Sequence, residues 1–140
     1  MVQVHLTYEG GLRVRAAHAP SRSELQTDAP VDNHGRGETF SPTDLLATSL
    51  GACMLTILGI YADREELDLN GSSAHVIKHM VADPRRRVGR LEVSLTLPAS
   101  IPERHRGPLQ NAARSCPVAL SLGESLQIDL GLEFTDLQSE

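Results

Sequence analysis

Two cysteines, Cys53 and Cys116, have the widest range of possible chemistry in this 140-residue chain. A cysteine can pack as a small apolar side chain, act as a nucleophile once its thiol ionises, or join a second cysteine in a disulfide. Because 63 positions separate the two and no CxxC motif is present, their spacing does not show whether they meet in the fold. The N-terminal MVQVHLTYEGG lacks the pattern of a signal peptide. We therefore expect a cytoplasmic chain whose cysteines are free thiols or a redox couple.

The surroundings of the two cysteines differ. Cys53 stands near the middle of LLATSLGACMLTILGIYA (45–62), eighteen residues without a charge, where a lone cysteine is usually a packing residue. Cys116 precedes Pro117, a residue that suits the first position of a helix. Cys116 is thus predicted to be an N-cap, where amide groups and the helix dipole favour a thiolate. By local electrostatics we expect Cys116 to ionise more readily than Cys53.

The apolar segment around Cys53 predicts a long helix over residues 41–66. Ser41 is a suitable N-cap, Pro42 a suitable first residue, and Asp44 favours the helix dipole. The segment just reaches membrane-spanning length, but serine, threonine and glycine dilute it and Asp63 flanks it, so we expect a core helix and no membrane partner. Both of its sides are apolar, and one small domain has difficulty enclosing such a helix. A second subunit would cover it.

Composition limits the classes of partner and core. The net charge is −5, and the one basic run, RRR at 85–87, is too short to predict nucleic-acid binding. Only 3% of the residues are aromatic, so the core must be aliphatic. The length fits a single domain over 1–140.

Alternation of polar and apolar residues predicts the remaining elements. Strands and a loop occupy 1–40, with a hairpin turn at Gly10-Gly11 and a short third strand near 25–27. Further strands fall within 72–98, a second helical region covers 102–122, and a last strand covers 125–134. This order predicts an α+β fold, not a series of βαβ units.

Four segments resemble a known family, that of osmotically inducible protein C and organic hydroperoxide resistance proteins (OsmC/Ohr). They are SPTDLLATSLGAC (41–53), GRLEVSLTLP (89–98), AARSCPVALSL (112–122) and, similar to a branch of redox proteins, TDAPVDNHGRGETFSPTDLL (27–46). The resemblance implies an OsmC-like fold. In it, an intertwined homodimer wraps two six-stranded sheets around paired central helices, with two active sites at the subunit interface.

The resemblance also implies roles for both thiols. Cys53 corresponds to the peroxidatic cysteine of the family and Cys116 to the resolving one. A Cys53 thiolate would attack an organic, lipid-like hydroperoxide, release an alcohol and become a sulfenic acid. Cys116 would then form a disulfide with it, to be reduced by an external dithiol, and no cofactor or metal is implied.

The sequence departs from the family at the group that activates the thiolate. Better-known members carry a Glu ten positions before the helix cysteine, paired with an Arg from the N-terminal region, but that position is Thr43 here. Asp44 is adjacent, yet one helical step rotates it by about 100°. Candidates for the cation are all arginines near the N-terminus: Arg13, Arg15, Arg22 and Arg36. The resemblance therefore supplies the thiol pair without its activating pair.

Other functions remain open at this point. The missing Glu motivates an alternative hypothesis. In it, the protein binds an apolar small molecule on the same dimer scaffold and has weak or no peroxidase activity. A Cys-His acyl transferase or thioesterase would need a histidine beside a thiol, and His34 is the nearest candidate along the chain. His75 and His79 are four positions apart, but in a predicted strand, so no metal site is expected.

Overall fold

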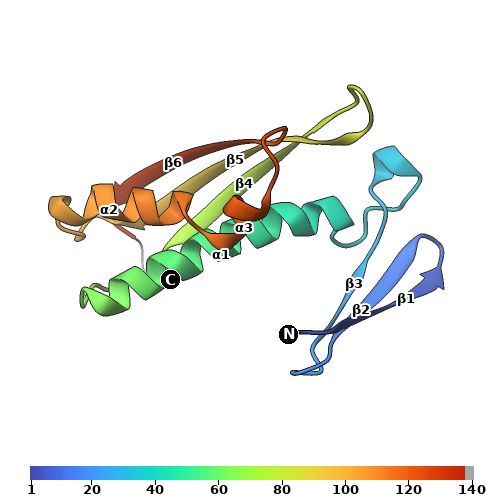
Figure 1. Ribbon diagram of the computed structural model, residues 1–140, viewed down its shortest axis with the longest axis horizontal. Coiled ribbons are helices and arrows are strands. Elements are labelled where there is room, and N and C mark those ends of the chain that lie inside the picture. The colour runs from blue at the N-terminus through green and yellow to red at the C-terminus, as the bar shows by residue number, and fades with distance from the viewer. Residues whose placement is uncertain (138–140) are drawn as a thin grey trace. The chain divides into compact units, whose positions relative to one another are not determined.

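The chain divides into two compact units in the computed structural model, which describes residues 1–137 (Figure 1). One unit comprises Met1–Leu46 and the other Ala47–Glu140. The mixed helices and sheets confirm the predicted α+β class. The prediction of a single domain stays a prediction.

The first unit contains an antiparallel sheet of three strands in the order β1-β2-β3. The strands are β1 (Val4–Gly10), β2 (Arg13–His18) and β3 (Glu24–Thr27). Gly10, Gly11 and Leu12 have positive φ angles at the β1–β2 turn, which confirms the predicted hairpin. Val4, Leu6 and Tyr8 alternate along β1 and are all exposed in the single chain. One apolar side of β1 therefore has no covering within this chain's described residues.

The loop predicted between β3 and the long helix contains one short 3₁₀ helix, η1 (Val31–Asn33). Its next residue, His34, has a left-handed φ of 69°. The following Gly35 is required sterically, because a Cβ atom there would lie 1.7 Å from the carbonyl oxygen of Ala29. The loop is thus a folded segment with its own packing.

The long helix, α1, covers Pro42–Arg64 as the apolar segment predicted. Its start is a capping box: Ser41 Oγ accepts the Asp44 amide at 3.1 Å, and Asp44 Oδ2 accepts the Ser41 amide at 2.9 Å. Helix α1 is long and apolar enough to cross a membrane, with a mean hydropathy of 1.9 over its best window. One third of that window is buried, which is what a core helix with an uncovered side shows.

A second three-stranded sheet, β4-β5-β6, belongs to the other unit. Strands β4 (Ser73–Val81) and β5 (Arg87–Pro98) are antiparallel, while β6 (Gln127–Thr135) runs parallel to β5. The β5–β6 connection carries α2 (Glu103–Arg114) and α3 (Pro117–Ser121). Gly51 lets α1 approach this sheet, since a Cβ there would be 3.0 Å from Val76 Cγ2.

The aliphatic core of this unit lies between the sheet and its helices. Four alternating residues of β5 face it and are almost fully buried: Leu91, Val93, Leu95 and Leu97. Leu50, Met54 and Leu58 contribute from α1, and Leu109 from α2. Since each described sheet has three strands, the six-stranded sheets of the implied dimer would need strands from a second copy, and they stay a prediction.

Candidate functional site

The two thiols meet in the second unit, although the sequence did not show whether they would. Cys53 lies on α1 and is partly exposed, while Cys116 is fully buried in the chain. Both are free thiols, and interaction with the Cys53 side chain is among the causes that raise the pKa of Cys116, so the two thiols are neighbours in the fold. The fold thus brings together the two sulfur atoms that a disulfide would join.

Cys116 is the N-cap of α3, as its position before Pro117 predicted. Its backbone is extended, with φ −66° and ψ 144°, and Pro117 takes the first helical position. Cys116 Sγ accepts the amide of Ala119 at 3.4 Å. The Cys-Pro pair therefore fixes this sulfur at the start of the short helix.

The expectation that the N-cap position makes Cys116 readily ionisable is wrong. Burial raises the pKa of the Cys116 thiol above its ordinary value of 9.0, and this effect exceeds the lowering by the Ala119 and Val118 amides. The hydrogen bond with Cys53 and the charge of a Cys53 thiolate raise the pKa of Cys116 further. Cys116 is therefore held as a neutral thiol beside Cys53.

The candidate cations lie in the first unit, where the nearby carboxylates hold most of them. Arg13 forms ion pairs with Glu38 and, at 3.7 Å, with Asp28. Arg15 contacts Glu9 at 3.5 Å and Glu24 at 3.4 Å. Arg13 is thus the arginine of the four that is bound to a fully buried carboxylate.

The remaining candidates are more exposed. Arg36 lies 3.8 Å from Glu38 with a side chain that is 80% exposed, and Arg22 and His34 are exposed as well. Thr43 Oγ1 is 3.2 Å from Ser41 Oγ at the start of α1. Thr43 therefore belongs to the hydroxyl cluster that begins the helix.

Asp28 is a buried acid that sequence reasoning missed. It is 1% exposed; its Oδ2 accepts the Glu38 amide at 3.1 Å, and its Oδ1 has no partner among the described residues. The only signal in the sequence was an acid directly after a strand and before Pro30. Such a position more often faces water.

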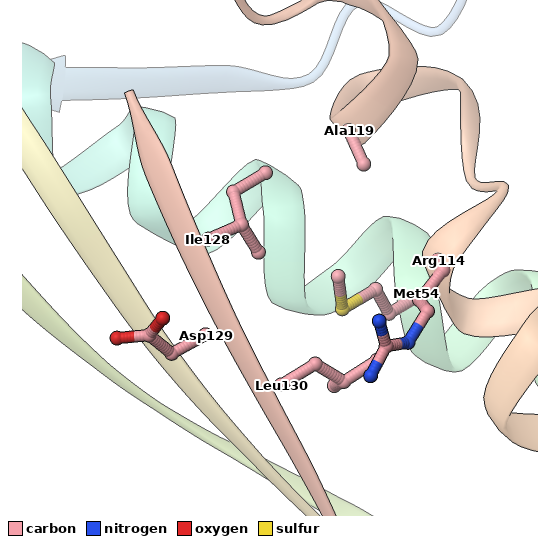
Figure 2. A pocket seen from close by; sticks show the side chains of 6 residues that line it. All are labelled: Met54, Arg114, Ala119, Ile128, Asp129 and Leu130. Atoms are coloured by element: carbon pink, nitrogen blue, oxygen red, sulfur yellow. The ribbon is translucent and has the colours of Figure 1, made fainter. Parts of the chain in front are cut away.

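A cavity of about 540 Å³ opens between α1, the α2–α3 region and β6 (Figure 2). Four of its lining residues are apolar, namely Met54, Ala119, Ile128 and Leu130, and Arg114 lies at one side. Asp129 also borders it. The cavity adjoins the thiols through the chain, because Met54 follows Cys53 and the Ala119 amide contacts Cys116 Sγ. No pattern in the sequence predicted this cavity.

Two histidines form side-chain hydrogen bonds that join neighbouring elements. His105 is nearly buried, and its Nδ1 lies 2.8 Å from the Tyr61 hydroxyl, joining α2 to α1. His79 Nε2 lies 2.7 Å from Glu92 Oε2 on the sheet face away from the core. Within residues 1–137, no group of three His, Cys, Asp or Glu side chains is placed to hold a metal ion.

Comparisons with known proteins concern the family and the fold of the chain. The family model described as OsmC-like protein matches residues 35–131. A crystal structure from Psychrobacter arcticus 273-4, of a protein described as osmotic stress induced and as a detoxification response protein, is 45% identical. Its TM-score is 0.89, with 95% of this chain and 96% of that chain covered. A search of curated proteins finds no match.

More distant structures share the fold. The OsmC-like protein of Mycoplasma pneumoniae has a TM-score of 0.80 at 14% identity, over 96% of this chain and 97% of that one. The organic hydroperoxide resistance protein OhrB of Bacillus subtilis has a TM-score of 0.69 at 17% identity, over 95% and 98%. On the family match and the 45% identical structure, this chain belongs to the OsmC-like family.

Proposed function

We propose that this protein is a thiol peroxidase that reduces organic hydroperoxides to alcohols. The observation that carries the proposal is the contact between the free Cys53 and Cys116 thiols. The fold that the chain shares with organic hydroperoxide resistance proteins supports it.

The proposed cycle has three balanced steps. The Cys53 thiolate attacks the outer oxygen of the hydroperoxide, so the O–O bond breaks, the alcohol leaves after taking a proton, and Cys53 becomes a sulfenic acid. Cys116 then attacks the Cys53 sulfur, and an S–S bond forms as water leaves. An external dithiol of the cytoplasm reduces the disulfide and is itself oxidised.

The environments of the two thiols support this division of roles. Cys53 is partly exposed, so a substrate can reach it, whereas Cys116 is fully buried. The raised pKa of Cys116 keeps a proton on that sulfur until the sulfenic acid forms. Since only a thiolate attacks a peroxide, Cys53 is the nucleophile.

The neighbours of the thiols support an organic substrate. Met54 and Leu50 are almost fully buried on the same helix as Cys53, and Cys116 lies in the same core. Apolar surroundings favour a hydroperoxide with an alkyl group over hydrogen peroxide, which must be desolvated to enter them.

We further propose that the working form is a homodimer. Apolar residues of β1 and α1 are exposed in the single chain, among them Leu6 at 67% and Ile60 at 52%. Exposed apolar surfaces on each of these elements are typical of regions that another protein covers.

Mass spectrometry of the peroxide-treated protein tests the cycle. One equivalent of cumene hydroperoxide should convert the two thiols of each chain into one intrachain Cys53–Cys116 disulfide. Cys53→Ser should abolish turnover. Cys116→Ser should permit one turnover and then accumulate sulfinic acid on Cys53, because no thiol traps the sulfenic acid.

Replacing a serine that lies outside the thiol pair provides the control. Ser115→Ala, next to Cys116, removes a hydroxyl that donates to the Asn111 carbonyl, and it should leave disulfide formation intact. If both thiols of the wild-type protein stay unmodified after treatment, the peroxidase proposal is wrong.

A further inference from the structure

The cavity beside α1 has the size and lining of a ligand site. Its volume of about 540 Å³ lies within the range of roughly 300–1,000 Å³ that is usual for small-molecule pockets. We propose that it binds an aliphatic carboxylate, with the alkyl chain in the cavity and the carboxylate on Arg114. The cavity adjoins the thiols, but neither Cys53 nor Cys116 lines it, so a ligand there would not need to react with either thiol.

The apolar part of the lining comes from three elements. Met54 of α1, Ala119 of α3, and Ile128 and Leu130 of β6 all border the cavity (Figure 2). Met54 supplies a flexible thioether that adapts to unbranched chains. Ile128 and Leu130 point to the same side of β6 because side chains alternate along a strand. An alkyl chain can contact these four side chains, while the polar part of the lining is left for a polar head group.

Arg114 is the cation of the cavity. Its side chain extends toward Met54 and Leu130 in Figure 2. Arg114 forms no ion pair or hydrogen bond through its guanidinium with any residue from 1 to 137. A guanidinium binds a carboxylate through two parallel hydrogen bonds, which a neutral head group cannot reproduce.

The one acid at the cavity does not oppose an anion there. The Asp129 carboxylate points away from Met54 and Leu130 in Figure 2. It accepts hydrogen bonds from Gln127 Nε2 at 2.9 Å and from Arg90 Nη1 at 3.1 Å, and these hold the pKa of Asp129 below its ordinary value. Its carboxylate is therefore held on the far side of β6, by an arginine that Glu92 shares at 3.1 Å.

Methyl NMR of the full-length reduced protein tests the site, because four lining residues carry methyl groups. Octanoate should shift the methyl signals of Met54, Ala119, Ile128 and Leu130 in a saturable way. Arg114→Gln should weaken octanoate binding by about tenfold, the loss expected for a partly exposed charge-assisted hydrogen bond. The neutral analogue octanamide should bind more weakly than octanoate, and equally to both proteins.

Arg104→Gln is the matched control, because it removes the same charge from the same helix away from the cavity. It should leave the octanoate affinity unchanged. The proposal is overturned if octanamide binds as tightly as octanoate, or if Arg114→Gln has no effect. It is also overturned if the four methyl groups contact a second copy of the chain and show no ligand shift. Binding requires no turnover, so this result is independent of the peroxidase test.

Discussion

Two opposing effects act on one sulfur atom at Cys116. The N-cap position offers amide hydrogen bonds to a thiolate, while complete burial removes the water that would solvate its charge. The pKa of Cys116 is raised, so desolvation is the stronger effect. A short helix of five residues also has a small dipole to set against that cost.

The raised pKa of Cys116 predicts a loss of stability in alkali. Below the unfolded-state pKa near 9.0 both states keep the proton, and the stability is complete. As the pH rises above that value, the unfolded chain ionises first, so the free energy of unfolding falls until the folded pKa is passed. Denaturant unfolding between pH 7 and pH 10.5 should show this loss in the wild type and a smaller one in Cys116→Ala.

The difference between the two unfolding curves isolates Cys116, because every other titrating group is common to both proteins. A difference that is constant across the whole range of pH would contradict the raised pKa.

At the residue scale, the sequence predicted the features that depend on neighbouring residues. It contained no signal for those that depend on residues distant along the chain. The Cys-Pro pair predicted the N-cap because the relevant atoms lie within three residues. Other features depend on segments far apart in the chain. They are the burial of Asp28, the contact between the thiols, and the position of the Arg114 charge at a cavity. Burial also reversed the predicted ionisation of Cys116, because capping is a local effect and desolvation is not.

Among the elements, α1 contributes to both the thiol site and the core. It supplies Cys53, Met54 and the core residues Leu50 and Leu58. Its start is defined by the reciprocal hydrogen bonds of Ser41 and Asp44. Ser41 is 1% exposed, so water cannot replace its hydroxyl if the side chain is removed.

Ser41→Ala should therefore lower the free energy of unfolding by about 0.5–2 kcal/mol, the usual cost of losing an N-cap. Thr56→Ala is the control within the same helix, because its exposed hydroxyl bonds only to the Ala52 carbonyl. It should change stability by no more than about 0.5 kcal/mol. Urea unfolding measures both losses. Equal losses in the two variants would show that the Ser41 cap stabilises the protein no more than an exposed hydroxyl within the helix does.

The helices and strands were predictable because their signals repeat. Alternation in β5 and the uncharged stretch of α1 each extend over many residues, so the positions reinforce one another. The turn in the loop before α1 depends on Gly35 meeting the Ala29 carbonyl, a single contact with no periodic pattern. Sequence periodicity therefore predicts elements better than it predicts the loops that join them.

At the scale of the whole molecule, large apolar side chains on several elements are exposed in the single chain. The apolar side of β1 and the Ile60 side of α1 are both exposed. Gly59 has no atom within 4 Å of the position of a Cβ, so the backbone of α1 is accessible there. Small residues beside an apolar one let a second helix approach closely, and a second copy of α1 is the partner that we propose.

A charge at Ile60 should therefore separate the subunits. Sedimentation equilibrium of the wild type should give about twice the chain mass of 15.2 kDa. Ile60→Lys should give the mass of one chain, because an unpaired ammonium in an apolar interface loses its water. Asn111→Lys adds the same charge at an exposed position of α2 and should remain dimeric. A monomeric wild type would contradict the proposed dimer outright. If Ile60→Lys stays dimeric while folded, the interface lies elsewhere, and the exposed side of β1, with Leu6 at its centre, becomes the surface where the subunits must meet.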